Sequence, residues 1–567
     1  MIDTPASPEY AVVPDRARTA RRWYDLSERW IVGGLIALVL AITALPYLYG
    51  YLSSPPERRF QGIIFDVPDT VQYFSWLRDH RSDWLVPNRM TAEPNPPALF
   101  NLLWLIVGRL QVVTGWSIPA LFQGLRLIAS TALLLMLYPV IARFTSGRAE
   151  RLNAYLLITL GAGLGWIWVI VKYARGMSGV PFPLDVYVAE PNTLLVIAAF
   201  PHFAVATTLI LAIFWCFLRI LDQHSRLVVV GAATLALLLT LQHAYDLLII
   251  SLVPAGALAL IWLRDRRIPW FGGVSLALIG GVAAPPALYF TWITSRDPLW
   301  RQVLAQFANA GVYTPSPLHL LVLIGLPLLV VIGTAIYGIF TMRGQPKITH
   351  ALATASNADL LLLSWLLVGF LLLYIPSDFQ IHMLTAWQVP VGVFAVRLLH
   401  RRIMPAVARK RARLAQMLPT LLLLAVLPTN LYLLTWRGYD LNRHAAPYYL
   451  SRGEESALRW LGQQTTRADV VLSGLDVGQY VPVYSDARTF LGHWAQTVTY
   501  YDKQADVSRF FSAATPEVER STLLRHFAVT YVVYGTEERA LGQFDPDGSA
   551  LFVPVFRTED VTIYGVR

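Results

Sequence analysis

The stretch WIVGGLIALVLAITALPYLY, residues 30–49, carries no charged side chain, and the acidic stretch DVPDTVQY, residues 66–73, follows it. An apolar run of this length crosses the hydrocarbon core of a bilayer as a helix. It is too long for a cleaved signal peptide and predicts an uncleaved anchor. The loop after it, up to Pro97, is rich in acids, aromatics and prolines, which a plain connection rarely needs. The sequence therefore predicts a membrane helix followed by a surface loop that carries chemistry or binding.

The composition extends this interpretation to most of the chain. Of 567 residues, 55% are hydrophobic and 14% are charged, and the mean hydropathy is +0.48. These values indicate a mainly α, polytopic bundle of transmembrane helices. We expect about eleven spans, near residues 30–49, 121–144, 154–171, 194–218, 228–241, 247–263, 270–292, 318–341, 360–374, 386–399 and 417–434.

The net charge of +10 lies mostly in short clusters between the apolar runs, at residues 16–22, 143–151, 219–226, 264–267, 343–347 and 397–413. Such clusters are typical of cytoplasmic loops, so the charge argues for a membrane protein and against nucleic-acid binding. The segment 97–113 is ambiguous. As a span it would invert every later cluster, whereas as an interfacial or re-entrant helix it preserves the charge rule. We therefore expect 97–113 to lie at the interface.

With that topology, the polar loops at 51–120, 172–193, 242–246, 294–317 and 376–382 all face outward, as does everything after residue 435. The tail changes character: residues 454–461 and 515–527 have helical patterns, whereas 469–473 and 529–535 are β-branched and aromatic. We expect a cytoplasmic N-terminal segment (1–29), a membrane-embedded catalytic module (30–435) and a small extracytoplasmic α/β domain (436–567).

Two carboxylates open the outward loop. Asp66 is expected either to cap the helix that follows it or to take part in chemistry. Asp69, Tyr73 and Trp76 recur at i, i+4 and i+7, so they share one helical face. A carboxylate beside lipid can have a raised pKa, which suits a general base.

The pattern Asp69-Thr70-Val71-Gln72-Tyr73, followed by Ser82-Asp83-Trp84-Leu85-Val86-Pro87, resembles the first outward loop of GT-C glycosyltransferases of the aminoarabinose transferase and protein O-mannosyltransferase type. By motif the resemblance covers residues 1–110. It implies a GT-C bundle that moves a hexosyl or pentosyl group from a polyprenyl-phosphate donor, with Asp69 as the catalytic residue. The family often has a lysine in the proline segment, whereas Glu93-Pro94-Asn95-Pro96 has none, so the resemblance does not extend to a phosphate contact there.

The resemblance also implies a second carboxylate after the third span, which Glu190 in Ala189-Glu190-Pro191 matches; turn chemistry is the alternative. Asp69, Asp66 and Glu190 are thus the candidate catalytic residues. Asp69 and Glu190 are also candidate ligands for Mg²⁺ or Mn²⁺, since these cations prefer oxygen ligands. Further candidates for substrate binding lie near the outward ends of spans or in the outward loops, where interfacial anchoring is the alternative: Tyr73, Glu93, Asn95, His202, His243, Asp246, Arg296, Gln380 and His382.

These observations favour a multi-pass glycosyltransferase of the plasma membrane, whose site faces outward. Its partners would be a lipid-linked sugar donor, membrane lipid and an acceptor that the sequence does not identify. Two other classes remain open: a transporter or flippase of lipid-linked sugars, and a non-catalytic membrane scaffold.

Overall fold

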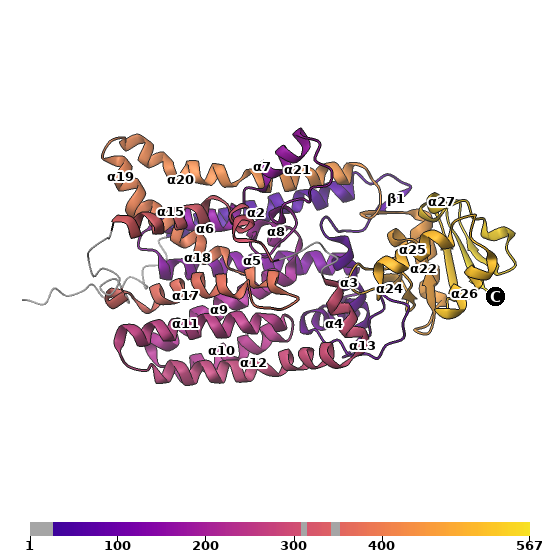
Figure 1. Cartoon of the computed structure of the whole chain (residues 1–567), viewed down its shortest axis with the longest axis horizontal. Coiled ribbons are helices and arrows are strands. Elements are labelled where there is room, and N and C mark those ends of the chain that lie inside the picture. Colours follow the sequence, from indigo (N-terminus) through magenta and orange to yellow (C-terminus); the bar gives the residue numbers. More distant parts are fainter. Residues whose placement is uncertain (1–25, 308–313, 342–351) are drawn as a thin grey trace, which may run out of the picture.

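The computed structural model describes residues 26–307, 314–341 and 352–567. Figure 1 shows a long helical bundle with a small sheet domain at one end. Within the described residues, eight helical stretches are long and apolar enough to cross a membrane: Ser27–Leu52, Ile118–Phe144, Arg148–Ala174, Pro201–Gln223, Ala244–Asp265, Trp270–Arg296, Gln380–Ala408 and Ala412–Asn442. The shorter apolar helices α10 (Arg226–Thr240), α15 (Leu326–Thr341) and α17 (Asn357–Leu372) lie where three further spans are predicted.

The long stretches are made of the following helices: α2 (Leu26–Leu52), α5 (Ile118–Phe144), α6 (Arg148–Leu160), α7 (Gly165–Ala174), α9 (Pro201–Gln223), α11 (Leu247–Asp265), α12 (Trp270–Arg296), α18 (Gln388–Leu398), α19 (Met404–Ala408), α20 (Ala412–Val426) and α21 (Pro428–Asn442). Basic clusters lie in the connection between α11 and α12 and on both sides of α19. Both places are at the end of the bundle away from the sheet domain (Figure 1). The predicted clusters at 16–22 and 343–347 lie outside the described residues.

Two predicted spans are interrupted where backbones approach closely. The chain breaks between α6 and α7, and again between α14 (Pro317–Ile324) and α15. A Cβ at Gly163 would lie 2.2 Å from the carbonyl oxygen of Val322, and Gly325 has a positive φ of 72°. Both positions require glycine, because any side chain would clash or strain the backbone there. The two breaks therefore pack against each other.

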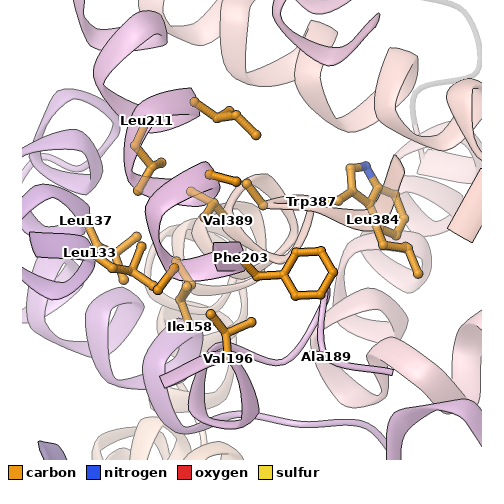
Figure 2. Close-up of a cluster of buried hydrophobic side chains, with 14 of the residues drawn as sticks. Leu133, Leu137, Ile158, Ala189, Val196, Phe203, Leu211, Leu384, Trp387 and Val389 are labelled. Atoms are coloured by element: carbon orange, nitrogen blue, oxygen red, sulfur yellow. The ribbon is translucent and has the colours of Figure 1, made fainter. Parts of the chain in front are cut away.

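The bundle core is formed by large apolar side chains from helices far apart in the sequence, and Figure 2 shows part of it. Leu133 and Leu137 on α5 face the same cluster as Trp387 beside α18. Within a membrane, close packing stabilises helix contacts more than the hydrophobic effect does. Ala189 and Phe203 also belong to this cluster. Their sequence neighbours Glu190 and His202 are therefore held by a packed core.

A layer of short elements lies between the bundle and the sheet domain; we name it the outward layer because it faces away from the basic end of the bundle. The strand β1 (Arg58–Phe60) follows α2 and pairs antiparallel with β2 (Tyr449–Ser451), which follows α21. The helices α3 (Val67–Asp79), α4 (Leu102–Thr114) and α13 (Pro298–Ala305) complete the layer (Figure 1). The segments after the first and the last span are thus joined by backbone hydrogen bonds.

The helix α4 corresponds to the ambiguous segment. Its 13 residues measure about 20 Å, less than the roughly 30 Å of the hydrocarbon core. The Asn101 side chain accepts hydrogen bonds from the first turn, and Trp104 is buried. One face is apolar and exposed, at Ile106, Leu110 and Val113. This helix is too short to span and has the exposed apolar face expected of an interfacial helix.

The C-terminal domain is α/β, as predicted. Its five-stranded sheet has the order β4-β3-β5-β7-β6: β4 (Arg488–Thr489), β3 (Val470–Leu472), β5 (Tyr531–Tyr534), β7 (Thr562–Val566) and β6 (Phe552–Arg557). The first three strands are parallel and the last two pairings are antiparallel. The helices α22 (Arg452–Gln464) and α26 (Glu517–His526) match the two predicted helices, and β3 and β5 match the two predicted strands. The helix α25 (Tyr500–Phe510) and the β6–β7 hairpin are additional elements.

Candidate active site

The first candidate carboxylate, Asp66, precedes α3 in a left-handed backbone conformation (φ 44°, ψ 65°). It occupies the N-cap position, but its side chain makes no capping hydrogen bond. Arg437 of α21 donates a hydrogen bond to the carbonyl of Ile64 (3.1 Å) and lies 4.5 Å from the centre of the Phe65 ring. The last span therefore holds the chain in place just before this strained turn. The Asp66 carboxylate is exposed and is not used as a cap.

The environment of Asp66 disfavours its charged form. Desolvation by the surrounding protein raises the pKa of Asp66 well above its ordinary value, and the nearby carboxylates of Asp69 and Glu190 act in the same direction. Solvent reaches the Asp66 side chain, so water screens part of this effect. Asp66 is therefore an acid that retains a proton more readily than a free aspartate.

Asp69, in the first turn of α3, meets the C-terminal domain. Its Oδ1 atom lies 2.8 Å from Nε2 of His493, which precedes α25 in the loop after β4. The side chain of His493 is only 2% exposed, whereas that of Asp69 is 26% exposed. The carboxylate therefore has one side fixed by the sheet domain, and solvent or a ligand still has access to it.

Tyr73 lies one turn after Asp69, as the helical spacing predicts. Its ring stacks on Trp104 of α4 with a centroid distance of 4.9 Å, and its hydroxyl lies 3.4 Å from Nε2 of His202. Burial raises the pKa of Tyr73 well above its ordinary value, and the charges of Asp69, Asp66 and Glu190 raise it further. These three carboxylates therefore all lie near enough to act electrostatically on Tyr73, although Asp66 and Glu190 are 124 positions apart in the sequence.

Glu190 reaches this cluster from the segment before α8 (Thr193–Ala199). It is buried, and its Oε1 atom lies 2.5 Å from Nδ1 of His382 in the 3-10 helix η4 (Gln380–Leu384). Tyr245 stacks on His382, with ring centroids 4.7 Å apart. The second carboxylate thus has a histidine partner, as the first one does.

A third pair lies beside the second. His243 and Asp246 are both buried, with Nδ1 of His243 3.2 Å from Oδ2 of Asp246. The hydroxyl of Tyr245 lies 3.4 Å from Nε2 of His243, and the rings of His243 and His202 are 5.5 Å apart. The predicted residues His202, His243, Asp246 and His382 therefore form one continuous group with Glu190.

Two other predicted substrate contacts are occupied within the protein. Glu93 pairs with the buried Lys503 of α25 at 2.7 Å. The amide of Asn95 closes its own loop through hydrogen bonds to the backbone of Asn88 and Glu93. The proline segment thus does meet a lysine, but the lysine comes from the C-terminal domain and neutralises Glu93.

Arg296 and Gln380 occupy less central positions. Arg296 is the last residue of α12, and its side chain is exposed. Gln380 is the first residue of η4. Its side chain donates a hydrogen bond to the backbone carbonyl of Ile375 and accepts one from the side chain of Thr314. Gln380 thus supports the short helix that presents His382, and the described contacts do not place Arg296 in the cluster.

The residue that sequence reasoning missed is His493. It lies 424 residues from Asp69 and stands in Leu491-Gly492-His493-Trp494, which has no motif that signals chemistry. Only the fold brings it to the outward loop. Tyr245 was also not singled out, although it is adjacent to two partners in the cluster.

The described part of the chain contains no group of three or more His, Cys, Asp or Glu side chains arranged to hold a metal ion. Asp69 and Glu190, the predicted ligands, are each hydrogen-bonded to a histidine instead. Mg²⁺ needs near-octahedral oxygen coordination, which two carboxylates engaged in this way do not supply. The donor set therefore does not fit a resident divalent cation.

No family model matches the chain, and no curated protein matches it. Among solved structures it is similar to the archaeal oligosaccharyltransferase AglB from Archaeoglobus fulgidus in complex with an inhibitory peptide and a dolichol-phosphate. That match has a TM-score of 0.51 and 12% identity and covers 90% of this chain and 70% of that one. A second similar structure, ArnT from Cupriavidus metallidurans bound to undecaprenyl phosphate, has a TM-score of 0.45 and 12% identity over 94% of this chain and 98% of that one. AglB is a GT-C glycosyltransferase. The fold of this chain is therefore the GT-C fold, which the resemblance around Asp69 and Tyr73 predicted.

Proposed function

We propose that this protein is a membrane glycosyltransferase that takes a sugar from a polyprenyl-phosphate-linked donor and passes it to an acceptor at the outer face of the membrane. The observation that carries the proposal is the pair of histidine-bound carboxylates, Asp69 and Glu190, at the sheet-domain end of a GT-C bundle. Tyr73, between them in the cluster, contacts His202. The AglB structure holds a dolichol-phosphate and the ArnT structure holds undecaprenyl phosphate. A lipid-linked donor therefore agrees with the fold.

In the proposed reaction, a hydroxyl or amide of the acceptor attacks the anomeric carbon of the donor sugar. The new bond forms as the bond from that carbon to the phosphate oxygen breaks, and the configuration inverts. Asp69 accepts the proton of the acceptor through Oδ2, because Oδ1 is engaged by His493. Asp66, whose pKa is raised, would hold a proton and orient the acceptor by donating a hydrogen bond.

The leaving group is a polyprenyl phosphate, whose negative charge needs donors. The cluster offers the imidazoles of His382, His202 and His243 and the hydroxyl of Tyr245. Glu190 orients His382 through its Nδ1 atom, which leaves Nε2 to face a ligand. In this proposal the histidines take the place of the arginine contact that was expected from Arg296.

The proposal includes an orientation in the plasma membrane. The basic connections at 264–267 and 397–413 lie at the end of the bundle away from the sheet domain, and basic loops stay in the cytoplasm. The site and the C-terminal domain would then face the extracytoplasmic side. Residues 264–267 and the sheet domain lie at opposite ends of the molecule. Assigning the basic end to the cytoplasm would therefore also place the sheet domain on the extracytoplasmic side.

The test compares cells with and without the gene. Mass spectrometry of their envelope lipids and glycoproteins identifies the sugar that fails to be transferred. Purified protein is then supplied with the polyprenyl-linked sugars extracted from cells that lack the gene. We expect Asp69→Asn to lower turnover by about 10²–10⁴-fold, the usual contribution of a general base.

Asp66→Asn is the matched control. Asparagine tolerates the left-handed conformation at this position, and no capping bond is lost, so the fold should be unaffected. We expect a smaller loss of turnover than for Asp69→Asn. Equal activity of Asp69→Asn and the wild type would reject the glycosyltransferase function and favour a transporter or a scaffold, neither of which needs a base at this position.

A further inference from the structure

The loop of residues 491–498 in the C-terminal domain is held rigidly over Asp69. Gln306, which follows α13, donates hydrogen bonds to the carbonyls of Ala495 (3.0 Å) and Thr497 (2.9 Å) and accepts one from the Tyr500 amide (3.0 Å). One side chain from the membrane module thus binds two carbonyls of this loop and the first amide of α25, which follows the loop. The loop is therefore ordered by the outward layer as well as by its own domain.

The opposite side of the loop is fixed to the segment that follows α3. The Asn88 amide donates to the carbonyl of Gln496 (2.8 Å), and the Val498 amide donates to the hydroxyl of Thr91 (3.0 Å). Thr497 donates to the carbonyl of Met90 (2.5 Å). These bonds cross from the loop to the segment 88–91 and leave the loop little freedom to move relative to α3.

Within this frame the histidine has a defined tautomer. The Nδ1 atom of His493 accepts hydrogen bonds from the amides of Ala495 (3.0 Å) and Gln496 (3.2 Å). In a neutral imidazole the proton therefore lies on Nε2, which donates to Oδ1 of Asp69 at 2.8 Å. The ring is 2% exposed, so its orientation is set by the protein rather than by solvent.

We infer that His493 is a positioning residue for Asp69: its Nε2–H fixes the carboxylate so that Oδ2 points to the acceptor. This inference rests on the proposed function, because it assigns the base a partner from the C-terminal domain. The C-terminal domain then completes the site through its loop 491–498, which carries His493. A misplacement of about 1 Å at a reacting group costs about 10²-fold in rate, which sets the size of the expected effect.

Two variants separate positioning from loop stability. In His493→Asn the side-chain oxygen takes the place of Nδ1 and can accept the two loop amides, but nothing reaches Asp69. In His493→Gln the side-chain amide reaches the place of Nε2 and can donate to Asp69, while the loop amides lose their acceptor. His493→Asn thus keeps the hydrogen bonds from the loop amides, and His493→Gln keeps the hydrogen bond to Asp69.

Full-length variants are purified and assayed with the polyprenyl-linked sugars extracted from cells that lack the gene. We expect His493→Asn to lower the maximal rate by about 10–10²-fold at an unchanged apparent KM for the extract, and His493→Gln to recover most of the rate. Cryo-EM maps provide a readout besides activity. In His493→Asn the loop should remain in place while the Asp69 carboxylate turns.

Several results would overturn the inference. One is wild-type rates in both variants. Another is the opposite order, with His493→Gln slow and His493→Asn fast, which would show that the histidine only supports the loop. An unturned Asp69 in the His493→Asn map would also reject it, whatever the activity. If Asp69→Asn itself is fully active, the proposed function fails instead, and the cryo-EM result still decides whether His493 positions the carboxylate.

Discussion

Replacing Arg89 by methionine should loosen the contact between the outward layer and the C-terminal domain. The Arg89 guanidinium makes two 2.8 Å hydrogen bonds to the carboxylate of Asp79 at the end of α3. It also donates to the carbonyls of Pro482, Ser485 and Ala487 in the C-terminal domain. The side chains of Arg89 and Asp79 are 1% and 3% exposed. This ion pair is therefore fully desolvated and joins two parts of the molecule.

The cost follows from what the substitution leaves behind. Methionine fills most of the volume, so the loss is electrostatic rather than a cavity. An unpaired carboxylate remains at Asp79, and breaking a buried pair in this way costs roughly 3–5 kcal/mol. At 1.4 kcal/mol per tenfold change, this shifts the opening equilibrium of the contact towards the open form by about 10²-fold to 4 × 10³-fold relative to wild type.

Hydrogen–deuterium exchange of the peptide 481–490 in the full-length protein measures this opening directly. Two controls define the scale. Asp486→Asn removes the ion pair of Arg78 with the half-exposed Asp486 and should change exchange by less than about tenfold. The double variant Asp79→Leu with Arg89→Met leaves no buried charge and should recover much of the loss. Exchange within about threefold of wild type in the single Arg89→Met variant would show that the pair does not hold the domains together, and the reasoning would fail.

Two further predictions concern other parts of the molecule. Burial, with the charges of Asp476 and Glu538, raises the pKa of Glu537 to about 8. The folded domain therefore holds a proton there that the unfolded chain loses above its ordinary value near 4.5, so stability should fall as pH rises from about 4.5 to 8. Thermal midpoints of Glu537→Gln should vary less than those of wild type across this window, and equal slopes would contradict the assignment. Cysteines placed at Leu102 and Thr114, the two ends of α4, should both react with an impermeant reagent from the outer side; labelling of one end only from the cytoplasm would make α4 a span.

The membrane half was largely predictable because its signals are local. An apolar run of about 20 residues has few alternatives to a span, and the basic clusters orient the runs. The same charge rule, with Asn101 and Arg109 within the segment, predicts an interfacial α4, and the short helix found there agrees with that prediction. Local patterns also identified α22, β3, β5 and α26. They missed β6 and β7 because exposed and half-buried side chains follow one another in β6 and leave no clean alternation.

The site was predictable only in part, because its contacts are not local. Asp69, Tyr73, Glu190 and the histidines could be singled out one by one as polar residues near membrane ends. The partners of these residues could not be predicted, because nothing in the sequence relates Glu190 to His382 or Asp69 to His493. The left-handed backbone conformation of Asp66 could not be predicted from the sequence either. A capping aspartate and an uncapped one have the same neighbours in sequence and differ only in φ and ψ.

Carboxylate–histidine pairs recur in the site, and they bear on the roles that we propose for Asp66 and Asp69. Asp69, Glu190 and Asp246 each meet a histidine: His493, His382 and His243. A carboxylate near lipid is costly to desolvate, and an imidazole partner offsets that cost without fixing a permanent positive charge in the site. Among the contacts of the described residues, Asp66 has no histidine partner, and desolvation raises its pKa well above its ordinary value. Within the proposed function, this difference in partners distinguishes the two neighbouring carboxylates at the start of α3. Asp66 would donate a hydrogen bond to the acceptor, whereas Asp69, oriented by His493, would accept the proton of the acceptor.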